Sequence, residues 1–350
     1  MGRTERENLI KLLEAKRQSK IITYVTLTDR PNVPILQVAD DAISPIYDQL
    51  EQIGSNKKID FFLYTRGGAV IAAYRIAKLI REYCEEFNVL IPFRAHSAGT
   101  LLALGADNIV MCKLGELSPV DPSTANMFNP ILRPPPQGDA GDPRNRVPIS
   151  VEDVTSYLDL SKEKVGLVSE SDKLEVFRIL ANKIEPLALG NVNRVYDEIR
   201  ILTRRLLSIH INPKTEEERL QKIVKGFTEE YTHECIITRD VANEFGLKIS
   251  KPDQQEENLM MSIWKEYENE LKMPEPLDSE ATLAQSQPPN TRVNIKLRLG
   301  FIETIAGGFT FELSGFVHPR LQQMSPLQPP PVIFKIGRWV NINQAVGPYV

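Results

Sequence analysis

Two apolar runs in this chain each end in a glycine-marked turn, and each turn opens a helical pattern. The run Ile59–Tyr64 leads into Thr65–Ala69, which reads Thr-Arg-Gly-Gly-Ala, and the run Val89–Phe93 leads into His96–Thr100, which reads His-Ser-Ala-Gly-Thr. Similar strand-like runs precede and follow this stretch. Short buried strands that alternate with helices predict a parallel α/β sheet with right-handed crossovers.

The two turns carry residue types that suit acyl transfer. Gly67 and Gly68 can expose bare backbone N–H groups to a substrate carbonyl, and Ser97 offers a hydroxyl next to the N–H of Ala98. Each feature also has a structural explanation. The glycines suit a tight turn with positive φ, and serine is a favoured helix N-cap. The G-x-S-x-G pattern is not met, because Ala95 stands at its first glycine.

Composition and charge limit the classes of partner and compartment. A net charge of −4 argues against a nucleic-acid or anionic-membrane surface. No apolar run approaches the roughly 20 residues that span a bilayer, and the charged N-terminus lacks a signal-peptide core. The 3 scattered cysteines suit reduced thiols, so we expect a cytoplasmic protein. No P-loop pattern is present, so any ATP-driven unfoldase would be a separate chain.

Changes in residue pattern predict the domain organisation. The α/β pattern and the helical patterns at 171–183, 191–209 and 215–228 predict one domain over residues 1–272. Thr215 and Glu218 form a predicted capping box. A proline- and glycine-rich insertion at 126–146 is expected to be a functional loop, a lid or a disordered insertion. Residues 273–290 read as a linker, and 291–350 as a small β module.

Several motifs in register resemble one family of peptidases. The segment 97–107 is similar to the nucleophile segment of Clp-type peptidases, and the segments 117–122, 186–192 and 236–247 are similar to further parts of one branch. Over roughly residues 20–250 the chain resembles the Clp-protease/crotonase-like fold, in particular the serine dehydrogenase proteinase and signal peptide peptidase A families. The resemblance implies a repeated ββα spiral core with added helices. It also implies Ser97 as nucleophile and the N–H groups of Gly67, Gly68 and Ala98 as oxyanion donors.

The resemblance does not by itself identify the proton acceptor. Clp-type peptidases carry a histidine where this chain has Asp121, and their acid belongs to the region that here holds His233. The two roles can have exchanged places, with His233 as base and Asp121 orienting it. The alternatives are that Asp121 is a turn residue before Pro122 and that His233 is a structural histidine. His96 directly precedes the nucleophile, so its side chain is expected to point away and to shape the pocket.

A lysine is the other possible base, as in the serine–lysine dyads of the signal peptide peptidase branch. Lys162, Lys164 and Lys173 are candidates, each with a solvated helix face as its structural alternative.

The resemblance implies a serine endopeptidase that acts on peptides or proteins, needs no cofactor or metal, and assembles as a homo-oligomer. A crotonase-type enzyme acting on acyl thioesters would use the two backbone N–H groups without the serine. A non-catalytic scaffold that keeps the fold is the third possibility.

Overall fold

The chain forms two compact units, one of which is built from two separate stretches of sequence. A computed structural model describes residues 2–120, 123–124, 127–131, 146–229, 235–285, 288, 291–319, 329–344 and 349. The first unit comprises Met1–Leu117 and Thr238–Val350, and the second comprises Ser118–Ile237. This division differs from the single domain expected over residues 1–272. Sequence periodicity identifies helices and strands, but it does not show which of them share a core.

The first unit contains one large mixed sheet. Its strands are β1 (Lys20–Thr26), β2 (Asn56–Tyr64), β3 (Cys84–Ile91), β5 (Asn108–Met111), β9 (Ile249–Ser250), β10 (Val293–Glu303), β11 (Gly308–Val317), β12 (Val332–Phe334) and β13 (Arg338–Asn341). The strand order is β12-β11-β10-β1-β2-β3-β5-β9, with β13 also paired to β11. Strands β1, β2, β3, β5 and β9 run parallel, which confirms the α/β core predicted from the sequence.

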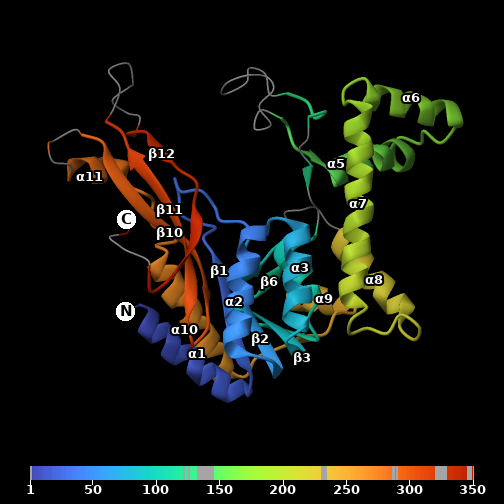
Figure 1. Ribbon diagram of the computed structural model, residues 1–350. Helices are drawn as coiled ribbons and strands as arrows, with labels where there is room; N and C mark the ends of the chain where they lie inside the picture. Colours follow the sequence, from blue (N-terminus) through green and yellow to red (C-terminus); the bar gives the residue numbers. More distant parts are fainter. Residues whose placement is uncertain are drawn as a thin grey trace. The chain divides into compact units, whose positions relative to one another are not determined.

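Helices cover both faces of this sheet (Figure 1). The helices of this unit are α1 (Arg3–Arg17), α2 (Ile43–Ile53), α3 (Val70–Arg81), α4 (Ala98–Leu104), α9 (Arg239–Glu244), α10 (Gln254–Glu270) and α11 (Ser279–Ala284), with the short 3-10 turn η1 (Asp40–Ala42) before α2. Two residues on one face of β1, Ile21 and Val25, join one buried cluster with Ile10 of α1 and Ile263 of α10. Burial of these apolar side chains is the main force that holds α1 and α10 on the sheet.

The predicted C-terminal β module is part of the same sheet. Strand β10 pairs antiparallel with β1, with Thr23 opposite Glu303, and the segment expected to be a linker contains α11. Buried Arg6 of α1 donates to both carboxylate oxygens of Glu303, at 2.8 and 2.9 Å. The alternating pattern of β10 indicated a half-buried strand, but it carried no information about the strand beside it.

The second unit is mainly helical. Its elements are β7 (Ser123–Thr124), β8 (Ile149–Ser150), α5 (Val151–Asp159), the π-helix η3 (Leu160–Lys164), α6 (Glu170–Ala181), α7 (Pro186–Leu207) and α8 (Glu217–Thr228). The capping box predicted at Thr215 is wrong. Helix α8 begins at Glu217, and its N-cap is Glu216, which makes no side-chain cap hydrogen bond.

No helix in the described part of either unit is long and apolar enough to cross a membrane.

Candidate active site

The glycine turn follows β2 and is held by the backbone of Val38. Gly67 has φ +105° and Gly68 has φ +148°, and α3 begins at Val70. The Val38 N–H donates to the Gly67 carbonyl at 2.8 Å, and the Ala69 N–H donates to the Val38 carbonyl at 2.7 Å. A Cβ on Gly68 would lie 2.3 Å from the Val38 oxygen. Glycine is required at 68 because backbone atoms occupy the space that a side chain would need.

The serine turn lies between the short strand β4 (Arg94–Ala95) and α4. Ser97 has φ 50° and ψ −113°, a sparsely populated region for a residue other than glycine. Such conformations cost about 1–3 kcal/mol and persist only where the surroundings enforce them. Ser97 is the N-cap of α4 by position, but it makes no side-chain cap hydrogen bond. Capping by its hydroxyl therefore does not explain the serine.

The structure brings the two turns into direct contact. The Thr65 N–H donates to the Arg94 carbonyl, and the His96 N–H donates to the Thr65 carbonyl, each at 3.0 Å. A Cβ on Gly67 would lie 2.8 Å from the Ser97 Cβ and 3.1 Å from the Ala98 nitrogen. The absence of a side chain at Gly67 is what lets the serine turn approach so closely.

The backbone donors of the two turns are not equivalent. The Gly67 N–H donates to the Thr65 hydroxyl at 3.1 Å. Within the described ranges, the N–H groups of Gly68 and Ala98 have no hydrogen-bond acceptor. Two of the three donors expected from the sequence therefore lack an acceptor among the described residues, and the third is bound within its own loop.

His96 faces an acidic side chain of the short strand β6 (Glu116–Leu117). Its Nε2 lies 3.1 Å from Oε1 of Glu116, and its ring is largely buried. Burial lowers the pKa of His96, and the attraction of Glu116 only partly offsets it. The imidazole is therefore turned toward β6, and a role of His96 in shaping a substrate pocket stays a prediction.

The predicted base and its partner, His233 and Asp121, lie outside the described residues. So does most of the 126–146 insertion, although Ile131 and Arg146 form an antiparallel bridge near its two ends.

The lysine alternatives all belong to the second unit. Lys162 and Lys164 are exposed on η3, and exposed Lys173 lies 2.6 Å from Glu170. A lysine that acts as a base is desolvated by its surroundings, whereas these three side chains are exposed. Their environment is that of solvated charges.

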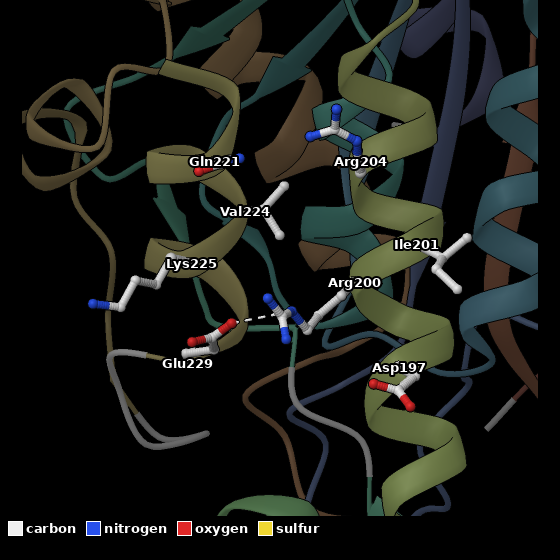
Figure 2. A pocket seen from close by; sticks show the side chains of 8 residues that line it. All are labelled: Asp197, Arg200, Ile201, Arg204, Gln221, Val224, Lys225 and Glu229. Carbon is white, nitrogen blue, oxygen red and sulfur yellow. Dashed lines mark ion pairs between the residues drawn. The ribbon is translucent and has the colours of Figure 1, made fainter. Parts of the chain in front are cut away.

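A pocket of about 610 Å³ lies in the second unit between α7 and the end of α8 (Figure 2). Figure 2 shows Arg200 of α7 directed toward Glu229, and the two side chains form an ion pair of 3.1 Å. Arg204 in the same pocket makes a bidentate pair with Glu217. The guanidinium groups are therefore already partnered. The pocket residues belong to the second unit, whereas the two turns belong to the first.

Among the described residues, no group of three or more His, Cys, Asp and Glu side chains is placed to hold a metal ion.

The decisive observation is that a strained serine and the backbone nitrogen of Ala98 lie directly against Gly67, within a segment that has known relatives. Residues 2–150 match the family of ClpP-like SDH-type serine proteinases. The family similarity predicted from the motifs is thereby confirmed over these residues. The matched segment contains both turns, and it supports a serine peptidase in general.

Other relatives extend the similarity without adding an activity. An uncharacterized protein of Methanocaldococcus jannaschii is 26% identical over 267 residues, which is 75% of this chain and 79% of the relative. A second uncharacterized protein of that organism is 29% identical over 124 residues, covering 34% of this chain and 42% of the relative. A solved membrane-bound stomatin-specific protease in complex with a substrate peptide is 16% identical, with a TM-score of 0.33, and the match covers 63% of this chain and 73% of that chain. That score is too low to carry a structural argument.

Proposed function

We propose that this protein is a serine endopeptidase with Ser97 as its nucleophile. The observation that supports this most directly is the conformation of Ser97, with φ 50° and ψ −113°, in a turn that packs against Gly67. Backbone strain of this kind persists mainly at functional sites. Here the strained residue is one that carries a hydroxyl, although a glycine would avoid the strain. The family match over residues 2–150 supports the same reaction class.

In the proposed reaction, the Ser97 Oγ attacks the carbonyl carbon of a peptide bond, and its proton passes to a base. The carbonyl oxygen becomes an oxyanion, which the N–H groups of Gly68 and Ala98 stabilise. The C–N bond then breaks, the amine leaves with the proton, and water hydrolyses the acyl-enzyme. Gly67 contributes by letting the turns meet, because its own N–H is bound to Thr65.

For the base, we propose His233, oriented by Asp121, on the resemblance of the sequence to Clp-type peptidases. A histidine is suited to this task because its ordinary pKa lies close to neutral pH. The exposure of Lys162, Lys164 and Lys173 favours His233 over a lysine.

Labelling with a fluorophosphonate tests the proposal. We expect one covalent adduct, located on Ser97 by peptide mass spectrometry and absent in Ser97→Ala. Ser208→Ala is the matched control, because Ser208 caps α7 and its hydroxyl donates to the Arg204 carbonyl. A folded wild type that gives no adduct at Ser97 would rule out the peptidase and leave an acyl-thioester enzyme or a scaffold. Full labelling of His233→Ala would reject the histidine and leave Ser97 in place.

We further propose that the active assembly is a homo-oligomer acting on peptides or proteins, fed where necessary by a separate unfoldase. Analytical ultracentrifugation of the full chain measures the assembly, and a monomer at all concentrations would reject that part of the proposal.

A further inference from the structure

One carboxylate in the first unit receives donors from both sides of the candidate site. Asp29 lies in the loop that follows β1. Its Oδ1 accepts from Nη2 and Nε of Arg66 at 2.7 and 3.1 Å. Its Oδ2 accepts from Arg94 Nη1 at 2.7 Å, from the Tyr64 hydroxyl at 2.8 Å and from the Thr28 hydroxyl at 2.7 Å. Five donors on one carboxylate fix its position firmly.

One of the two arginines that bind Asp29 lies in the glycine turn, and the other lies in the short strand that leads into the serine turn. Arg66 immediately precedes Gly67, and Arg94 begins β4, three residues before Ser97. Asp29 therefore connects the glycine turn to the serine turn through side chains, in addition to the backbone hydrogen bonds at Thr65. A carboxylate held between two guanidinium groups fixes geometry as well as charge, because each fork has defined donor directions.

The connection continues from Arg94 to the residue beside the serine. Arg94 Nε donates to Oε1 of Glu116 at 2.9 Å, and the same oxygen lies 3.1 Å from Nε2 of His96. The order of contacts is therefore Arg66, Asp29, Arg94, Glu116 and His96. This series of contacts begins in the glycine turn and ends at His96, the residue that precedes Ser97.

Partial burial makes the pair of Asp29 with Arg94 stronger than an open surface pair, whereas the side chain of Arg66 is 47% exposed and its pair with Asp29 is closer to a surface one. The side chains of Asp29 and Arg94 are 30% and 23% exposed. Partial burial alone would raise the pKa of Asp29, but hydrogen bonds from Thr28 and Tyr64 and the charge of Arg66 outweigh it and hold that pKa below its ordinary value. The carboxylate is accordingly charged at neutral pH and attracts both guanidinium groups.

We propose that Asp29 is a positioning residue for Ser97, which keeps the serine turn and the glycine turn in the register that the reaction needs. The inference rests on the proposed function for its catalytic consequence and on the contacts above for its structural part. The strained Ser97 backbone has to be enforced by its surroundings. A shift of the order of 1 Å between nucleophile and oxyanion donors is enough to slow a reaction about a hundredfold.

The test compares two carboxylates in the first unit that each pair with arginine. Asp29→Asn removes the negative charge that attracts both Arg66 and Arg94. Asp40→Asn is the matched control, because Asp40 pairs with Arg75 at 3.0 Å on an exposed surface, with a side chain that is 66% exposed. Two measurements are made on the full chain. Hydrogen exchange by mass spectrometry follows residues 65–69 and 95–99, and saturation kinetics of fluorophosphonate labelling separate the maximal rate from the affinity for the probe.

For Asp29→Asn we expect faster exchange in both turns and a maximal labelling rate lower by about tenfold or more, with little change in probe affinity. Asp40→Asn is expected to match the wild type within about twofold in both measurements. Arg66→Gln, which removes one arm only, should speed exchange in residues 65–69 more than in 95–99.

Each outcome separates this inference from the proposed function. Unchanged exchange in both turns of Asp29→Asn overturns the inference, whether or not the wild type is labelled. Faster exchange with an unchanged maximal labelling rate also overturns it. Faster exchange in a protein whose wild type is not labelled keeps the connection between the turns and rejects the peptidase.

Discussion

The glycine turn and the serine turn reach unusual backbone conformations in opposite ways. Gly67 and Gly68 adopt positive φ at low cost because they lack a Cβ, and close neighbours occupy the space where one would lie. Ser97 keeps its Cβ at φ 50° and therefore stores strain. Packing thus explains the glycines, whereas Ser97 carries a strain that a glycine at the same position would avoid. A residue that is costly for the fold is the stronger indication of a function.

The largest effect on stability and labelling is expected from a glycine substitution that disturbs the contact between the two turns. Gly67→Ala places a methyl group 2.8 Å from both the Ser97 Cβ and the His96 oxygen, at φ +105°. We expect a loss of about 3 kcal/mol in the free energy of unfolding, measured by urea denaturation, and loss of labelling at Ser97.

Gly54→Ala is the control for that loss. Gly54 also has positive φ, +65°, but a Cβ added there would meet nothing within 4 Å. It should lose only about 1 kcal/mol, with labelling unchanged. Equal losses in the two variants would show that contact between the turns contributes little.

Relieving the strain at Ser97 should have a smaller effect of opposite sign. Ser97→Gly is expected to be more stable than Ser97→Ala by about 1 kcal/mol, because glycine adopts φ 50° and ψ −113° without the Cβ penalty. Both variants lose the hydroxyl, so their difference isolates the backbone, and both should be unlabelled. A glycine variant less stable than the alanine variant would mean that Ser97 is not strained.

The smallest expected effect is a pH dependence from His96. Its folded-state pKa lies below its ordinary value, so the unfolded state takes up the proton first as pH falls. His96 therefore favours folding above its unfolded pKa of about 6.5 and loses that contribution below it, with a slope of at most about 1.4 kcal/mol per pH unit.

Urea denaturation of the wild type and His96→Gln at about pH 8 and pH 5 measures this slope, on either side of the ordinary histidine pKa. His318→Gln controls for removal of an imidazole elsewhere in the unit. A wild-type slope that persists in His96→Gln would assign it to other groups.

The parallel core could be predicted because its signals are local. The apolar run of β2, the glycines after it and the apolar periodicity of α3 lie within about 25 consecutive residues, a span in which backbone preferences and burial determine secondary structure. The family similarity could be predicted for the same reason, since its motifs are short and in register.

The partners of these elements could not be predicted. The antiparallel pairing of β10 with β1 joins residues that are far apart in the sequence. An alternating apolar and polar pattern predicts a strand, but it does not identify the strand beside it. Asp29 gave no signal either. It is one acidic residue in a polar loop, and only folding brings the side chains of Arg66 and Arg94 to it.

Local patterns along the chain were enough to establish a parallel α/β core, two turns able to offer a hydroxyl and backbone N–H groups, and the family to which residues 2–150 are matched. Three-dimensional packing was needed to show that the turns touch, that Ser97 is strained, and that the Gly67 N–H is bound to Thr65 while those of Gly68 and Ala98 lack an acceptor among the described residues. The difference is one of range. Turn and helix preferences act between neighbours along the chain, whereas strain, close approach and shared hydrogen bonds arise when distant segments pack against one another.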